Sequence, residues 1–168
     1  MAGRFTHILV PTDFSPASGA ALSYAKELAA RFDARLSLLH VVTNPQATGV
    51  WTPDVYVPAS PEMREGFLRE ARARLENAVT AEERTRFRVT IAADIGAVAE
   101  KIQDFVREQQ VDLVVMGTHG RTGLAHLFLG SVAERVVRSA SCPVLTTHAA
   151  AGPDPASDSV TAANVAVR

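Results

Sequence analysis

Residues 111–144, VDLVVMGTHGRTGLAHLFLGSVAERVVRSASCPV, are the stretch that decides the fold. Its first part, residues 111–116, is almost entirely apolar and rich in β-branched side chains. Such a run predicts a strand buried on both faces, because helices cover both faces of a parallel sheet. A glycine-rich loop follows, and Gly130-Ser131 then opens a segment whose apolar residues recur at helical spacing. We therefore predict a strand, a glycine loop and a helix.

The junction between this glycine loop and the helix predicts a site for an anion. Glycine lets backbone amides approach a ligand without a Cβ in the way, and the first amides of a helix add the positive end of its dipole. Phosphate is the ligand that we expect. Spacing alone leaves a second interpretation open, in which the glycines only shape the turn after the strand.

Several familiar site motifs are absent from the sequence. No lysine precedes Ser131, as a P-loop requires, and the loop lacks the G-x-G-x-x-G pattern of dinucleotide-binding folds. Ser131 also lies outside a G-x-S-x-G turn, so a hydrolase nucleophile is not indicated. The histidines show no H-x-x-x-H or Cys/His grouping, so no protein metal site is predicted.

Outside this stretch the chain alternates strands with helices. The predicted strands are residues 7–10, 35–42, 87–91, 111–116 and 143–147. The predicted helices begin after the capping pairs Ser15-Pro16 and Ser60-Pro61, after Gly96, and at Gly130-Ser131. The second of them has a predicted buried stripe of Met63, Phe67, Ala71, Leu75 and Ala78. This alternation predicts an α/β fold, one parallel sheet with helices on both faces.

The sheet in turn predicts where a ligand would bind. In such folds ligands lie at the carboxyl ends of the strands, where the winding direction switches. If the switch lies between the first and fourth strands, Pro11, Thr12 and Asp13 face the loop that starts at Gly117 across one crevice.

Composition limits the class of protein. The 168 residues suffice for one domain, and a net charge of -1 provides no bulk basic field for nucleic acid or an anionic membrane. No apolar run reaches the roughly 20 residues of a membrane helix. The first residues lack a signal peptide and Cys142 is the only cysteine, so we expect a cytoplasmic protein without disulfides.

Two segments do not follow the alternation. For residues 43–60 we predict an irregular connection. Trp51 and Tyr56 in it either pack on the body of the domain as anchors, or belong to a mobile flap or a partner contact. Residues 149–168 predict a disordered tail, because they have no sustained periodicity.

The glycines also match a longer pattern, G-x2-G-x9-G-[ST], through Gly117, Gly120, Gly130 and Ser131. This pattern resembles the ATP-binding signature of the universal stress protein family. The similarity spans residues 4–148 and includes ILVPTDFS at 8–15 and CPV at 142–144. It implies a single five-stranded parallel sheet of order 3-2-1-4-5 with helices on both faces, adenine nucleotide alpha-hydrolase-like or Rossmann-like. The family domain would be residues 1–148, and the tail residues 149–168.

The resemblance also implies which residues meet ATP. The first strand end would contact adenine and ribose, with Asp13 as acceptor, and Val41 would pack on the base. The glycine stretch would hold the phosphates, with Mg²⁺ arriving on them. His119 within it either donates to phosphate or caps the turn. The full set implied by the resemblance is Pro11, Thr12, Asp13, Val41, Met116, Gly117, His119, Gly120, Gly130, Ser131, Val132 and Ala133.

The resemblance implies an ATP-binding regulator that acts in the stress response, as a homodimer through the last strand, Val144 to Thr147. The threonines there reduce the apolar content but keep β propensity. Two alternatives stay open. One is a weak ATPase or nucleotidyl-transfer enzyme, for which no catalytic residue is identified, and the other is an interaction module that binds no nucleotide.

Overall fold

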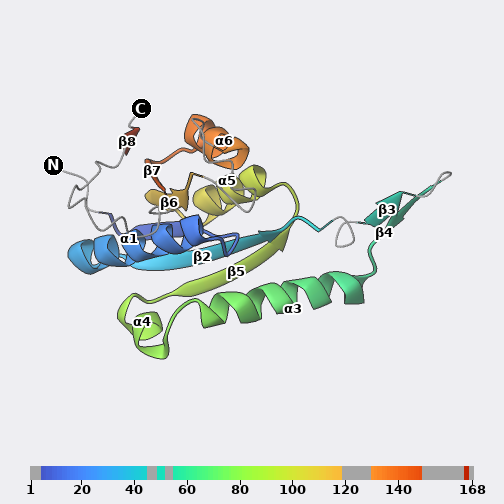
Figure 1. Cartoon of the computed structure of the whole chain (residues 1–168), viewed down its shortest axis with the longest axis horizontal. Helices are drawn as coiled ribbons and strands as arrows, with labels where there is room; N and C mark the ends of the chain where they lie inside the picture. The colour runs from blue at the N-terminus through green and yellow to red at the C-terminus, as the bar shows by residue number, and fades with distance from the viewer. Residues whose placement is uncertain (1–4, 45–48, 52–54, 119–129, 149–164, 167–168) are drawn as a thin grey trace, which may run out of the picture.

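One parallel sheet organises the molecule (Figure 1). The computed structural model describes residues 5–44, 49–51, 55–118, 130–148 and 165–166. The sheet has the order β5-β2-β1-β6-β7-β8, and all pairs are parallel except β7 with β8. Its strands are β1 (His7–Pro11), β2 (Arg35–Val42), β5 (Thr90–Ile95), β6 (Leu113–Gly117), β7 (Val144–Thr147) and β8 (Val165–Ala166). Numbered along the chain, the five parallel strands run 3-2-1-4-5, which confirms the predicted topology.

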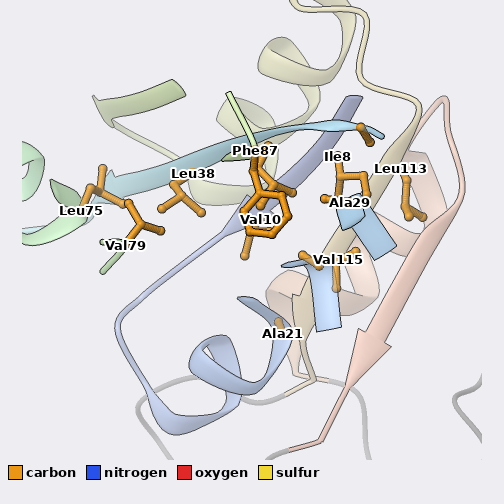
Figure 2. Packing of buried hydrophobic residues seen from close by; sticks show 13 residues of the cluster. Ile8, Val10, Ala21, Ala29, Leu38, Leu75, Val79, Phe87, Leu113 and Val115 are labelled. Atoms are coloured by element: carbon orange, nitrogen blue, oxygen red, sulfur yellow. The ribbon is translucent and has the colours of Figure 1, made fainter. Parts of the chain in front are cut away.

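Helices pack on both faces of this sheet, and among the described residues each face has one main hydrophobic core, with a smaller cluster of Val42, Ala71 and Ile95 beside them. Side chains alternate between the faces of a strand, so Ile8 and Val10 enter one core while Leu9 enters the other. The first core receives residues of α1 and α3, and the second those of α5 and α6. Figure 2 shows the first core, where Ile8, Val10 and Val115 of the strands lie beside Ala21 and Ala29 of α1. The helices are α1 (Pro16–Phe32), α3 (Pro61–Asn77), α4 (Ala81–Arg86), α5 (Val98–Glu108) and α6 (Ser131–Ser139).

The predicted helix starts at Ser15-Pro16 and Ser60-Pro61 are confirmed. The hydroxyl of Ser15 accepts a hydrogen bond from the Ser18 amide, and the hydroxyl of Ser60 accepts one from the Met63 amide. Each cap satisfies one of the amides that the first turn of a helix leaves without a partner.

Two local predictions are wrong. Phe87 does not begin a strand, because it is the C-cap of the short helix α4, and β5 starts only at Thr90. Thr80 and Glu83 form a reciprocal capping box that starts α4, a signal that the apolar alternation of residues 87–91 obscured. Met63 is 50% exposed rather than buried, since it lies in the first turn of α3, which extends beyond the sheet in Figure 1.

The connection at residues 43–60 contains a two-stranded antiparallel hairpin, β3 (Gly49–Trp51) with β4 (Tyr56–Pro58). Figure 1 shows this hairpin beyond the end of α3, away from the main sheet. The predictions for the side chains of Trp51 and Tyr56 lie outside the described residues. Most of the predicted tail does too, but Val165 and Ala166 form β8. No described helix is long and apolar enough to cross a membrane.

Candidate functional site

A cavity of about 740 Å³ opens at the carboxyl ends of β1, β2 and β6. The sheet order reverses direction at β1, since β2 lies on one side of it and β6 on the other, so the cavity occupies the switch point. Ten of the residues implied by the family resemblance line the cavity. They are Pro11, Thr12, Asp13, Val41, Met116, Gly117, Gly130, Ser131, Val132 and Ala133. His119 and Gly120 lie outside the described residues.

Hydrogen bonds fix the turn that follows β1. The Thr12 amide donates to the carbonyl of Leu39, 2.9 Å away, and the Thr12 hydroxyl donates to that of Ser18 over 3.0 Å. The Ser15 amide donates to Oδ1 of Asp13 over 3.0 Å. Partial burial acts to raise the pKa of Asp13, but hydrogen bonds from Ser15 and Ser18 outweigh it and hold that pKa below its ordinary value. Asp13 therefore stays a carboxylate at neutral pH and accepts hydrogen bonds.

An aromatic and cationic stack supports the same turn. Phe14 has a φ of 63°, an uncommon conformation for a bulky residue that its surroundings must hold. Its ring lies 4.6 Å from the His40 ring, and the Arg74 guanidinium carbon lies 3.9 Å from its centroid. The His40 Nδ1 donates to the carbonyl of Thr12 over 2.7 Å, because a carbonyl can only accept.

Helix α3 contributes a wall of the cavity that the sequence analysis did not predict. The residues are Phe67, Glu70, Ala71 and Arg74. Their spacing of i, i+3, i+4 and i+7 puts them on one helix face, and this spacing could have been recognised in the sequence. The charged members made that face resemble a solvated one, and only the fold shows that it lines the cavity. His40, Thr43, Asn44 and Thr118 were missed as well.

The opposite wall starts at the end of β6. Gly117 passes so close to α1 that a Cβ on it would lie 2.9 Å from the backbone carbon and Cβ of Ala17. The buried Thr118 follows, and its amide donates to the carbonyl of Thr147 over 2.8 Å. Its own carbonyl accepts from the Gly130 amide over 2.7 Å, so one hydrogen bond joins the residues on either side of 119–129.

The N-terminus of α6 faces the cavity without a side-chain cap. Gly130 is its N-cap residue and makes no side-chain hydrogen bond to the first turn. Ser131, Val132 and Ala133 occupy the first three helical positions, whose amides have no acceptor within an α-helix. All three residues line the cavity, where their amides and the helix dipole favour an anion.

The cavity therefore combines three kinds of surface. The Asp13 carboxylate accepts hydrogen bonds from hydroxyl or amino groups, and the α6 terminus attracts negative charge. Val41, Val98, Ile102 and Met116 provide apolar lining. A ligand with a flat apolar part, hydroxyl groups and an anionic end matches these surfaces together. The described residues hold no group of three His, Cys, Asp or Glu side chains placed to bind a metal ion.

The model of the universal stress protein family matches residues 4–148. The chain belongs to this family. The universal stress protein YxiE of Bacillus subtilis is 38% identical over 149 residues, which cover 84% of this chain and 97% of YxiE. The solved structure of the universal stress protein MJ0577 of Methanocaldococcus jannaschii matches with a TM-score of 0.71 at 29% identity. The match covers 87% of this chain and 97% of the MJ0577 chain.

Another universal stress protein shares the fold at greater distance. The structure of one from Archaeoglobus fulgidus in complex with dAMP has a TM-score of 0.51 and 18% identity, and the match covers 86% of this chain and 99% of that one. Some structural neighbours of this universal stress protein thus bind nucleotides.

Proposed function

We propose that this universal stress protein binds ATP in the cavity between β1 and α6 and acts as a nucleotide-dependent regulator in the cytoplasmic stress response. The observation that carries the proposal is the uncapped N-terminus of α6, which lines the same cavity as the ionised Asp13. The amides of Ser131, Val132 and Ala133 would bind the phosphates, and Asp13 would accept hydrogen bonds from the nucleoside. Val41 and Met116 would pack on the base.

The charge distribution supports this orientation of the ligand. A carboxylate repels phosphate, whereas helix amides attract it, so the phosphates belong at α6 and the uncharged nucleoside at β1. Magnesium would accompany the phosphates and be held mainly by their oxygens and water, as Mg²⁺ commonly is.

A regulator is favoured over a hydrolase by the properties of Asp13. A general base works best when its pKa lies near the working pH, whereas the pKa of Asp13 is held below its ordinary range. Its carboxylate also accepts a hydrogen bond from the Ser15 amide, which fixes its position. These features suit recognition of a donor group better than removal of a proton from water.

The same proposal includes a homodimer. The side of β7, Val144–Thr147, that faces away from β6 would pair with a second copy of the chain in place of β8, because amides and carbonyls there can bond a further strand. Nucleotide would then stabilise the folded chain that forms this dimer.

The first experiment asks which ligand the protein carries. Protein purified without added nucleotide is denatured, and the released small molecules are identified by ion-pair chromatography. We expect ATP or ADP at close to one molecule per chain. An empty protein that also shows no heat of binding with ATP and Mg²⁺ would overturn the proposal.

A second experiment tests the α6 amides directly. Ser131→Pro removes one amide donor and one hydroxyl, but proline suits the first helical position, and the extended conformation of Gly130, with ψ of 150°, tolerates a following proline. We expect calorimetry to show ATP binding weakened about tenfold or more, because hydrogen bonds to charged groups contribute about 1.5–3 kcal/mol.

Ser131→Ala is the matched control, since it removes the hydroxyl and keeps the amide. It should weaken ATP binding less than Ser131→Pro does. Equal affinity in the proline variant and the original protein, with the fold intact by circular dichroism, would show that the α6 terminus does not hold the phosphates.

A further inference from the structure

The C-terminal strand β8 occupies part of the sheet edge that the proposed dimer would use. Ala166 pairs with Val144, and Val165 pairs with Leu145, in antiparallel register. The other edge of β7 is filled by β6 over its whole length, from Val144 to Thr147. Only one edge of β7 therefore remains for a further strand, and β8 lies on it (Figure 1).

A strand edge can pair with one neighbour at a time, because each outward amide and carbonyl makes one ladder hydrogen bond. We propose that β8 is a built-in competitor for self-association. While β8 is docked, it blocks Val144 and Leu145, and a second copy of this chain can pair with β7 only after β8 leaves. The inference rests on the proposed homodimer but not on nucleotide binding.

The dimensions of β8 make this competition reversible. The strand covers two residues of β7 and leaves Thr146 and Thr147 without a partner from β8. So short a ladder is weak alone, but residues 149–164 tether it to β7. For two segments joined by a short flexible linker, the effective concentration is in the millimolar range. A second copy, at ordinary protein concentrations, must compete against that local excess.

The competition has a steep effect because a symmetric dimer needs two free edges. If β8 is docked four-fifths of the time, the competent fraction is about one-fifth for each chain, and the apparent dissociation constant of the dimer rises about 25-fold. Removing β8 should lower the dissociation constant by such a factor. A cellular factor that binds the C-terminal residues would have the same effect without any change at the cavity.

The test compares four chains by sedimentation velocity over a concentration series. They are the full chain, a chain that ends at His148, the full chain with Val165→Pro and Ala166→Pro, and a control with Ser159→Pro and Thr161→Pro. Proline removes the ladder donors of β8 in the third chain, whereas the fourth receives the same number of prolines outside β8.

We expect the truncated chain and the β8 proline variant to dimerise at least several-fold more tightly than the full chain and the control. Equal dissociation constants in all four would overturn the inference. Weaker dimers after truncation would overturn it as well, because β8 would then belong to the dimer interface. A chain ending at His148 that stays monomeric at high concentration would refute both the inference and the proposed dimer.

Nucleotide binding is measured on the same four chains by calorimetry, so that the two proposals can fail separately. No described residue that lines the cavity lies beyond Ala133, so ATP affinity should be equal in all of them. Absence of ATP binding in every chain would reject the proposed nucleotide function, while the sedimentation results would still decide the role of β8.

Discussion

At the scale of single residues, Gly117 shows how closely β6 approaches α1. A Cβ there would meet Ala17 at 2.9 Å, far inside contact distance. We expect Gly117→Ala to lower the free energy of unfolding by about 1–3 kcal/mol through overpacking, measured by denaturant titration. It should also weaken ligand binding, since Gly117 lines the cavity.

Gly19 provides the matched control on α1 itself. A Cβ at Gly19 would meet nothing within 4 Å, and the residue lies inside a helix. Gly19→Ala should therefore raise the free energy of unfolding by about 0.4–1 kcal/mol. Loss of stability in both variants alike would show that the contact with Ala17 is not what requires glycine at Gly117.

His7 is a buried titratable residue at the opposite end of the sheet from the cavity. It is 3% exposed, with Nε2 2.7 Å from the Ser37 hydroxyl and Nδ1 3.0 Å from the Gln109 carbonyl. Burial lowers the pKa of His7, the Gln109 bond opposes this, and the nearby Arg35 lowers it further, while Asp112 raises it. The folded protein therefore favours the neutral ring.

This environment gives a pH dependence of stability. Below pH 6.5, the ordinary pKa of histidine, the unfolded chain binds a proton at His7 that the folded chain resists. The free energy of unfolding should therefore fall as the pH decreases from 6.5, by up to about 1.4 kcal/mol per pH unit from this residue. Urea titrations between pH 7.5 and 5 measure it. In His7→Gln this part of the slope should disappear, and an unchanged slope would assign the effect to other groups.

Residues of the site differ in how far the sequence alone could reveal them. The anion site at Gly130 was predicted from a local signal, the start of a helix after a glycine loop. Asp13 was placed beside it by the end of the first strand, and its role as an acceptor was implied by the family resemblance. Arg74 and His40 were not predicted, because their importance arises from the stack on Phe14, which joins three distant segments of chain. Local patterns contain no information on such contacts.

At the scale of elements, we expect the β3–β4 hairpin to contribute little to the stability of the fold. Two-stranded hairpins are marginally stable alone. Val55, just before β4, is 56% exposed, and Val57 within β4 is 47% exposed. We expect that replacing residues 47–58 with a short Gly–Ser linker changes the free energy of unfolding by less than about 1 kcal/mol. Denaturant titration measures the change, and calorimetry with ATP shows whether the hairpin contributes to the cavity.

The same linker in place of α4 is the control. Glu83 in α4 forms an ion pair with Lys26 of α1 at 2.7 Å, and Arg84 donates to the carbonyl of Glu76. That replacement should destabilise the chain more than loss of the hairpin. A larger loss from removing the hairpin would mean that it packs on the body and so contributes to the core.

Helices and strands were predictable where a single sequence signal, such as an apolar run, was strong. Apolar runs located β1, β2 and β6, because strands buried on both faces have few polar residues. The start of β5 was predicted too early, at Phe87. The Phe87 side chain is only 5% exposed, but the residue is the C-cap of α4 and not part of a strand. A pattern of apolar residues indicates which side chains are buried, but not the backbone conformation. A strand residue and a helix C-cap residue can both be buried, so the pattern could not distinguish them.

At the scale of the whole molecule, ligand binding and folding are linked. A ligand that binds only the folded chain should stabilise it by about 2.7 kcal/mol at a hundredfold excess over its dissociation constant. For a chain of this size, saturating ATP with Mg²⁺ should raise the melting temperature by about 5–11 °C. Differential scanning fluorimetry measures the shift. Ser131→Pro should show a smaller one, and an identical shift in both would locate the ligand elsewhere.

The hydrogen bond from the Gly130 amide to the Thr118 carbonyl has a consequence for engineering the chain. It joins the residue after β6 to the N-cap residue of α6, two positions that the chain itself connects only through residues 119–129. Lengthening a closed loop costs only about 0.6 kcal/mol for each doubling. We therefore expect a reporter peptide inserted after residue 121 and before Gly130 to leave the strand end and the helix start in register. Thr118 and Gly130, which this hydrogen bond joins, both line the cavity, so its wall should keep its shape in such a chain.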